Sequence, residues 1–365
     1  MRRALASCGA IGDNEFPMTQ TSEEVSEVRR AHVFDQQALA RYMTEHVEGF
    51  RGPLAVQQFK GGQSNPTFLL EADGRRYVLR KKPPGKLLAS AHQVDREYRV
   101  MRALADSDVP VPAALALCED DGVIGAAFYI MDFVEGRIFR NAQLPDQSPA
   151  ERTAIYDHMN EVLARLHGVD YAAAGLGDFG KPGNYIARQI NRWTKQYRAA
   201  ETGTIEPMEQ LIAWLPEHLP AGDETCIAHG DFRLENTICH PTEPRIVAVL
   251  DWELATLGHP LADLAYNCLP YHMHNAELGS LDRTDFAATG IPREQDYVAA
   301  YCRRTGRDDI EHWNFYLAFS LFRLASIVQG VYKRALDGNA SSDTASAYGD
   351  VCAALAGLAW SMVDA

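Results

Sequence analysis

The stretch of sequence that decides the fold is His229-Gly230-Asp231-Phe232-Arg233-Leu234-Glu235-Asn236. It places Asp231 five positions before Asn236, and the short apolar run 237–239 follows directly. A second apolar run, residues 246–250, ends in Asp251. We expect the two runs to pair as a small β-hairpin, with three oxygen-bearing side chains gathered at one edge of it.

These three side chains suit a divalent cation and a proton acceptor. Asn236 and Asp251 offer the hard oxygen atoms that Mg²⁺ prefers, and Asp231 can accept the proton of a hydroxyl group. Phosphoryl transfer needs this combination, because the protein mainly positions phosphates, holds the metal and places a carboxylate near the attacking hydroxyl. A single carboxylate at a strand end is commonly a plain turn residue, so the prediction rests on the joint pattern.

The chain before this stretch is predicted to be rich in β-strands. Short runs of β-forming residues occur at 54–59, 67–70, 77–80, 115–118 and 128–131. One helix interrupts them, with Ser90 as its expected N-cap and apolar residues at helical spacing from Val94 to Leu104. We assign residues 31–131 to a small antiparallel N-terminal lobe that binds nucleotide, and the polar residues 1–30 to a flexible tail.

The remainder of the chain is predicted to be mainly helical. Helical periodicity covers 150–167, 184–199, 206–215, 294–304, 311–334 and 344–363, and the hairpin described above is the single β-structure expected among them. Residues 132–365 therefore form a larger helical lobe that carries the catalytic loop and the substrate site. The predicted fold class is α+β, with a small β-rich lobe and a larger helical one.

Composition excludes several classes of protein. Hydrophobic residues make up 46% and charged residues 23% of the chain, an ordinary globular balance, and the net charge of −14 argues against nucleic acid as a partner. Seven scattered cysteines without a C-x-x-C spacing favour neither a disulfide framework nor a zinc site. The apolar runs 315–322 and 351–363 are shorter than the roughly 20 residues of a membrane span. We expect a cytoplasmic protein that binds no membrane.

The motif at 229–251 resembles the signature of protein kinases, which have an Asp in the catalytic loop, an Asn five residues later and a metal-binding Asp beyond. It departs from that signature at two places, with His229-Gly230-Asp231 for H-R-D and Asp251-Trp252-Glu253 for D-F-G. Both departures are similar to the aminoglycoside phosphotransferase and choline kinase superfamily, whose members phosphorylate small molecules. Over about residues 50–335, the resemblance implies a bilobal protein-kinase-like fold with ATP and Mg²⁺ held between the lobes.

The resemblance also implies roles for single residues. In the larger lobe, Asp231 is the expected catalytic base, Asn236 and Asp251 bind the metal, and His229 and Asp263 support the loop. In the smaller lobe, either Arg80 or Lys81 stands where the family carries its phosphate-binding lysine, with Glu97 as the expected ion-pair partner. The other residues expected to bind ATP lie in a glycine-rich turn and in the connection between the lobes: Gly61, Gly62, Ser64, Asn65, Met131 and Phe133.

One helix points to the acceptor. Residues 184–199 include Arg188, Arg192 and Trp193, and together with residues 78–88 they resemble the kinase-like domain fused to some acyl-CoA dehydrogenases. That resemblance implies a hydroxyacyl-CoA acceptor, to which Glu253 is also assigned, and a functional link to an acyl-CoA dehydrogenase. A plain amphipathic helix with an aromatic anchor explains the same residues equally well.

Two other hypotheses stay open. An aminoglycoside, amino-sugar or amino-alcohol kinase needs an acidic pocket for its cationic acceptor, whereas the last third of this chain mixes acidic and basic residues. A catalytically inactive nucleotide-binding protein is suggested only by Arg80 in place of lysine, and Asp231, Asn236 and Asp251 oppose it. The sequence leaves the small-molecule acceptor and the oligomeric state open.

Overall fold

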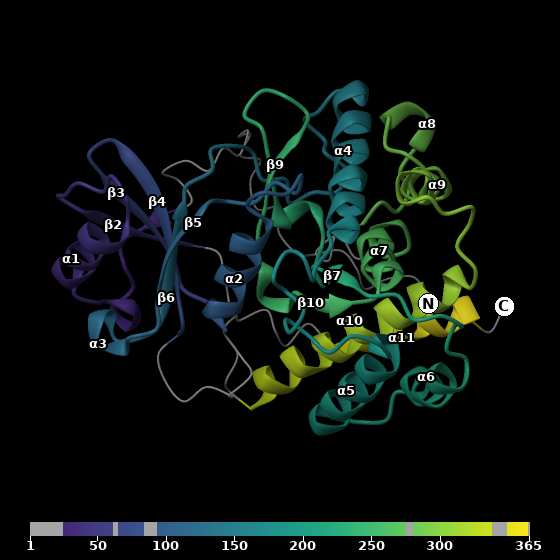
Figure 1. Cartoon of the computed structure of the whole chain (residues 1–365). Coiled ribbons are helices and arrows are strands. Elements are labelled where there is room, and N and C mark those ends of the chain that lie inside the picture. Colours follow the sequence, from purple (N-terminus) through teal and green to yellow (C-terminus); the bar gives the residue numbers. More distant parts are fainter. Residues whose placement is uncertain (1–24, 61–64, 84–92, 275–279, 338–348, 364–365) are drawn as a thin grey trace, which may run out of the picture.

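The computed structural model describes residues 25–60, 65–83, 93–274, 280–337 and 349–363. A small part built on one β-sheet lies beside a larger part built mainly of helices (Figure 1). Within the described residues there are eleven α-helices, and the sheet has six strands. The predicted α+β, bilobal kinase-like architecture is confirmed.

The six-stranded sheet is antiparallel throughout, in the order β1-β2-β3-β4-β6-β5. Five of its strands were predicted, and the predicted ends differ from the observed ones by no more than two residues. The sixth, β1, belongs to the segment predicted to be a flexible tail; residues 1–24 of that segment lie outside the described part. The strands are β1 (Val25–Ser26), β2 (Ala55–Phe59), β3 (Thr67–Ala72), β4 (Arg75–Lys81), β5 (Ala114–Cys118) and β6 (Phe128–Asp132).

Helices cover both faces of this sheet, and the two faces have different cores. Helices α1 (Gln36–His46) and α3 (Asp121–Ile124) pack on the outer face, and α2 (Val94–Leu104) packs on the face toward the larger lobe (Figure 1). Side chains alternate between faces along a strand. Tyr77 and Leu79 therefore join the outer core, whereas Val78 joins the core shared with the larger lobe.

Two of these helices were not predicted. Helix α1 carried a readable signal, because the carboxylate of Asp35 accepts hydrogen bonds from the amides of Gln37 and Ala38, and Leu39 and Met43 are buried four residues apart. Helix α3 is only four residues long and lies between two predicted strands. Helix α2 begins at Val94 with Gln93 as its N-cap residue, and the predicted cap Ser90 lies outside the described residues.

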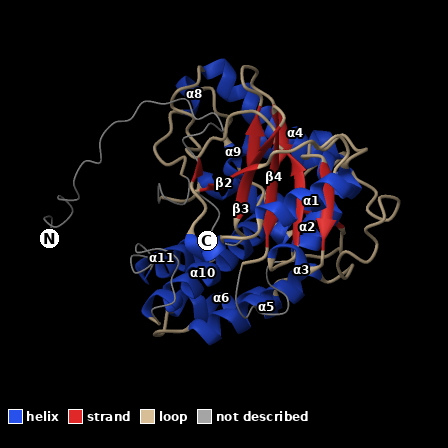
Figure 2. Ribbon diagram, turned by 90° about the vertical axis from the view of Figure 1, so that its left-hand side faces the viewer, coloured by secondary structure: helices blue, strands red, loops and turns tan. Residues whose placement is uncertain are grey.

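Helices build most of the larger lobe, and α5, α6, α10 and α11 gather below the sheet (Figure 2). Six of its helices match the predicted ranges; α7 and α8 were missed. The helices are α4 (Pro149–Gly168), α5 (Tyr185–Ala200), α6 (Glu206–Glu217), α7 (Pro260–Cys268), α8 (Phe286–Thr289), α9 (Glu294–Thr305), α10 (Trp313–Leu336) and α11 (Gly349–Val363).

Two small hairpin-like sheets interrupt these helices. The predicted pair is present as β8 (Thr237–Cys239) and β9 (Ile246–Val249). The expectation of a single β-structure was wrong, because β7 (Cys226–Ala228) also pairs with β10 (Thr256–Gly258). Strands of three residues carry too little periodicity to be recognised from sequence.

Helix α10 is the one described helix that is long and apolar enough to cross a membrane by length and composition. However, 72% of its apolar window is buried inside the protein. It contacts α5, α7 and α11, which is the environment of a core helix.

Candidate active site

The loop 229–236 runs from the end of β7 into the short 3₁₀ helix η3 (Leu234–Asn236), and buried groups hold it from two sides. The Asp263 carboxylate on α7 accepts hydrogen bonds from the backbone amides of His229, at 2.7 Å, and Gly230, at 2.9 Å. The His229 ring donates through Nε2 to the Leu250 carbonyl, at 2.8 Å. The loop is thus tied to α7 on one side and to the end of β9 on the other.

Asp263 can bind the backbone amides of the loop firmly because its carboxylate is ionised and buried. Burial alone would raise the pKa of its carboxyl group, but hydrogen bonding from His167 and the nearby positive charges keep that pKa below its ordinary value. The His167 Nε2 atom lies 3.2 Å from the Asp263 carboxylate. A carboxylate that accepts several N–H groups is a rigid anchor for a backbone turn.

Gly230 is required by the shape of the loop. Its φ is +83°, and a Cβ atom at this position would lie 2.8 Å from the Leu254 carbonyl oxygen. Any other residue would meet both backbone strain and a close backbone contact.

We expect Gly230→Ala to destabilise the protein by about 1–3 kcal/mol and to lower turnover, because the loop must move to admit the methyl group. Gly306→Ala is the matched control, since Gly306 has a similar φ of +70° with open space around it. Urea unfolding and steady-state rates would measure both effects. Equal loss of turnover in the two variants would contradict the close-contact argument.

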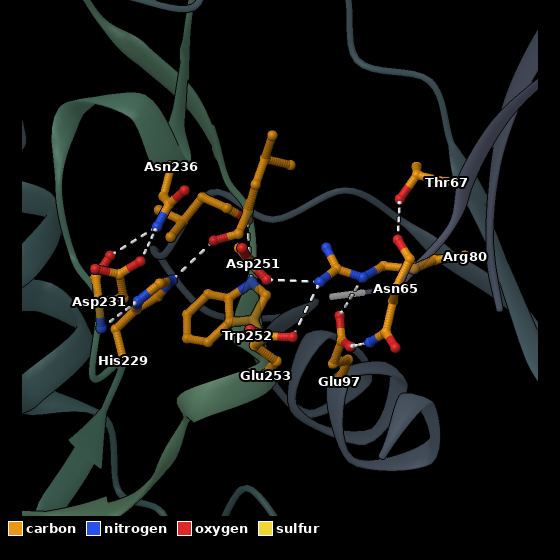
Figure 3. Close-up of polar contacts among 12 residues, drawn as sticks. Asn65, Thr67, Arg80, Glu97, His229, Asp231, Asn236, Asp251, Trp252 and Glu253 are labelled. Atoms are coloured by element: carbon orange, nitrogen blue, oxygen red, sulfur yellow. Dashed lines mark hydrogen bonds and ion pairs between the residues drawn. The ribbon is translucent and has the colours of Figure 1, made fainter. Parts of the chain in front are cut away.

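Asp231 and Asn236 face each other across the loop (Figure 3). The Asn236 side-chain amide donates to the Asp231 backbone carbonyl and to its Oδ2 atom, both at 2.9 Å. The Asp231 Oδ1 atom is buried and has no hydrogen-bond partner within the described structure. The Asp231 carboxylate is therefore oriented by Asn236 and keeps one oxygen available for a ligand.

Arg233 is a site residue that was not predicted. Its Nε atom lies 3.5 Å from Asp231 Oδ2, and its Nη2 atom lies 3.0 Å from Glu235. The signal was present in the sequence, because Arg233 lies two positions after Asp231 within the decisive stretch. Its positive charge favours the approach of an anionic group to the Asp231 carboxylate.

Asp251 turns the chain at the end of β9 with a left-handed φ of +63°. This turn directs its carboxylate toward the small lobe, where it meets Arg80 on β4 (Figure 3). The Arg80 guanidinium lies 2.7 Å from Asp251, 3.2 Å from Glu97 and 3.5 Å from Glu253. A forked guanidinium can contact three carboxylates at once, which the point charge of a lysine does less well.

Glu97, on α2, is the most buried of these carboxylates and is held by neutral groups as well. It accepts hydrogen bonds from the Asn65 side chain at 2.8 Å and from the Tyr129 hydroxyl at 3.0 Å. Burial raises the pKa of Glu97 to about 7, although the positive charge of Arg80 opposes the shift. Burial alone would lower the pKa of Arg80, but Glu97 and Asp251 raise it.

The structure brings Arg80, and not Lys81, to the cleft between the lobes. Successive residues of β4 point to opposite faces, so Lys81 shares the outer face with Tyr77 and Leu79. Its amine lies 5.1 Å from the centre of the Phe34 ring, and burial lowers its pKa. Of the two residues left open by the sequence, Arg80 is the one that faces the cleft, and its binding of phosphate stays a prediction.

A largely apolar cavity lies between the sheet and β8–β9, beside Arg80 and Asp251. Met131 lines it as predicted for the connection between the lobes, but Phe133 does not: its ring packs against Arg76, and its amide donates to the Arg76 carbonyl. Gly61, Gly62 and Ser64 lie outside the described residues. Lining residues that sequence reasoning missed include Phe59, Thr67, Val78, Met101, Tyr129, Val134, Ile238 and Leu250.

The residues near Asp251 fit a magnesium ion held jointly with phosphates. Within the described chain no group of three or more His, Cys, Asp or Glu residues is arranged as a complete metal site. Mg²⁺ is usually bound by one or two carboxylates together with substrate phosphates, and it keeps several waters. The Asp251 carboxylate and the Asn236 side-chain oxygen supply a partial oxygen set of this kind, and the Asp231 carboxylate lies next to Asn236.

The residues of α5 that were predicted to bind the acceptor differ in how deeply they are buried. Trp193 is buried, with a guanidinium from Arg323 stacked 5.7 Å from its ring. Arg192 is exposed and lies over the same ring, at 5.6 Å. Arg188 donates a hydrogen bond to the Lys181 carbonyl. Trp193 thus faces the interior toward α10, whereas Arg192 lies at the surface.

Comparison with known proteins places the chain in a family. Residues 55–301 match the model of the phosphotransferase enzyme family known as APH. The chain belongs to this family. The match spans both lobes and contains Arg80, Glu97, the loop 229–236, Asp251 and Asp263, whereas the whole of α10 lies beyond it.

Several relatives of this chain are named as acyl-CoA dehydrogenases. The chain is 48% identical to mouse acyl-CoA dehydrogenase family member 10 over 94% of its own length, and 43% identical to human family member 11 over 93%. It is 46% identical to the Arabidopsis thaliana protein named probable acyl-CoA dehydrogenase IBR3 over 89%. The chain spans only 33%, 44% and 42% of the lengths of these three relatives.

Solved structures confirm the architecture. A Ralstonia eutropha protein assigned to the aminoglycoside phosphotransferases is 54% identical, with a TM-score of 0.84 over 91% of this chain and 99% of that one. The enzyme APH(4)-Ia, in complex with AMP-PNP and hygromycin B, is 18% identical with a TM-score of 0.57, over 88% of this chain and 98% of that one. This second likeness shows the fold alone.

Proposed function

We propose that the protein transfers the γ-phosphoryl group of Mg-ATP to a hydroxyl group of a small molecule, and that this acceptor is a hydroxyacyl-CoA. The observation that carries the phosphoryl transfer is the meeting of Arg80, paired with Glu97, and Asp251 across the cleft, one loop away from Asp231. Two lobes thereby supply a phosphate-binding cation, a metal-binding carboxylate and a base to one place.

In this mechanism the residues of the chain bind, orient and move a proton. Arg80 holds the α- and β-phosphates, and the apolar cavity beside Met131 holds the adenine. Asp231 Oδ1 accepts the proton of the acceptor hydroxyl while the acceptor oxygen bonds to the γ-phosphorus. The bond from that phosphorus to the bridging oxygen breaks, and its electron pair leaves with ADP. Asn236 and Asp251 would hold Mg²⁺, which would supply positive charge to offset the charge of the phosphates.

Three observations support an anionic acceptor. Arg233 lies beside Asp231, the exposed Arg192 lies on α5, and relatives of 43–48% identity are named as acyl-CoA dehydrogenase family members. A CoA ester offers several phosphates to such arginines. The same names support a functional link between this reaction and a dehydrogenase that acts on acyl-CoA.

An aminoglycoside or amino-sugar acceptor is the second candidate. It is favoured by the assignment of the 54% identical Ralstonia eutropha protein. A polycationic acceptor would lie beside Arg233, which is electrostatically unfavourable.

Release of ADP, measured with Mg-ATP and one acceptor at a time, tests the proposal. The panel holds hydroxyacyl-CoAs, aminoglycosides, amino sugars and amino alcohols, with the matching acyl-CoAs that lack a hydroxyl as controls. We expect stimulation by a hydroxyacyl-CoA and none by its control. If only aminoglycosides stimulated ADP release, the acceptor would be an aminoglycoside and not a hydroxyacyl-CoA. If no compound in the panel stimulated it, the proposed phosphotransferase activity would be refuted.

Substitutions of the neighbouring residues Arg80 and Lys81 test which of them binds the phosphates of ATP. We expect Arg80→Met to weaken Mg-ATP binding by about 10- to 100-fold, the effect of about 1.5–3 kcal/mol for a hydrogen bond to a charged group. Lys81→Met, on the opposite face of β4, should change the affinity by no more than about twofold. Isothermal titration calorimetry measures both. A larger loss in the Lys81 variant would contradict the assignment of Arg80.

A further inference from the structure

Arg323, in the middle of α10, is a buried cation that none of the functions discussed above uses. Only 6% of its surface is exposed. No ion pair between Arg323 and a carboxylate is found among the described residues, and its Nε atom has no hydrogen-bond partner. A buried guanidinium without a counter-charge costs several kcal/mol, so such a residue is poorly explained by stability alone.

The contacts of Arg323 lead directly to the catalytic loop. Its Nη2 atom donates a hydrogen bond of 2.6 Å to the Gly230 carbonyl. That carbonyl belongs to the peptide group joining Gly230 to Asp231, and the amide of Gly230 is held by Asp263 on the other side. Both polar groups of Gly230 are therefore fixed, one by α7 and one by α10.

Two aromatic rings hold the guanidinium in place. Its central carbon lies 5.7 Å from the Trp193 ring of α5 and 5.0 Å from the Tyr266 ring of α7. Burial, and then the negative charge of Asp231, raise the pKa of the Tyr266 hydroxyl group. Three helices thus meet around one cation, which bonds to the peptide group that precedes Asp231.

We propose that Arg323 is a positioning residue, which fixes the peptide bond before Asp231 and so aims the Asp231 carboxylate at the acceptor hydroxyl. Trp193 then acts through Arg323, as the ring that keeps the guanidinium against the loop. The proposal rests on the proposed function, since it assigns Asp231 to catalysis. Small displacements of a catalytic group are costly: about 1 Å can lower a rate about 10²-fold.

Two measurements on three variants test the proposal. Arg323→Met removes the charge and retains the length, Arg323→Lys retains a donor, and Gln329→Met is the control on the same helix. Gln329 is as deeply buried but bonds to the Ala200 carbonyl, away from the loop. Amide hydrogen exchange over 229–236 reports the loop, and steady-state kinetics report turnover.

For Arg323→Met we expect loop exchange to rise about tenfold. We also expect kcat to fall about 10²-fold, with KM for ATP within about twofold and a melting temperature no lower than that of the control. Arg323→Lys should recover part of both losses. Unchanged loop exchange, unchanged kcat, or an equal kcat loss in Gln329→Met each overturns the proposal. If the wild-type protein phosphorylates no acceptor, the proposed function fails, and the exchange measurement alone decides whether Arg323 holds the loop.

Discussion

Asp251→Asn should abolish stabilisation by Mg-ATP. At about 100 times its Kd, Mg-ATP is expected to add about 2.7 kcal/mol to the free energy of unfolding of the wild-type protein. The variant keeps the size of the side chain but removes the negative charge that meets Arg80 and that we propose holds the metal. Both the metal and the phosphates then lose their anchor, and the Mg-ATP shift should disappear.

Thermal unfolding with ATP, with Mg-ATP and with Mg-ATP plus EDTA measures this effect. Chelation should remove the shift from the wild-type protein and change nothing in the variant. Asp178→Asn is the matched control, because Asp178 also pairs with an arginine but lies at the surface. A full Mg-ATP shift in Asp251→Asn would show that the metal-binding carboxylate lies elsewhere.

Asp231→Asn should leave binding intact and nearly stop turnover. General base catalysis contributes about 10²–10⁴-fold, and an amide cannot accept the proton of the acceptor hydroxyl. Asn236 and Arg233 contact the Asp231 side chain, so the loop keeps its neighbours when the shape is conserved. We therefore expect kcat to fall by about 10²–10⁴-fold, with the Mg-ATP shift retained.

Comparison of Asp251→Asn with Asp231→Asn distinguishes the residue that binds the metal from the residue that acts as the base. Rapid-quench measurement of a single turnover separates the chemical step from product release. If Asp231→Asn lost Mg-ATP binding as well, Asp231 would belong to the metal site. If it turned over at the wild-type rate, another group would be the base.

Much of this fold was readable because its strands and helices are locally encoded. The run of β-forming residues at 77–80 predicts a strand, and the helical spacing of Ile155, Met159 and Val162 on α4 reflects one buried face. Helix α4 also begins with a capping box of Ser148 and Glu151. The elements that were missed, such as β7, β10 and α8, are three or four residues long and depend on tertiary contacts.

The site was predicted where a motif fixes spacing and missed where distant segments meet. The spacing of Asp231, Asn236 and Asp251 is local, so it was readable. Nothing local indicates that Arg323, ninety-two residues after Asp231 in the chain, bonds to the catalytic loop, since only the packing of α10 against α7 brings the two together.

The opposite faces of Arg80 and Lys81 could have been predicted from the sequence. Tyr77 and Leu79 are large and apolar, and a two-residue period puts Lys81 on their face. Phe133 does not line the cavity, because the strand ends at Asp132 and the alternation no longer decides where a side chain points. Its half-buried ring instead packs against Arg76.

The most direct test of the account is the mass of the acceptor after incubation with Mg-ATP. Intact mass spectrometry of a hydroxyacyl-CoA should show the gain of one phosphate, with an equal amount of ADP formed, and no gain for the acyl-CoA that lacks the hydroxyl. ADP formed with inorganic phosphate alone, or an unchanged mass for every acceptor in the panel, would contradict direct transfer to a hydroxyl group.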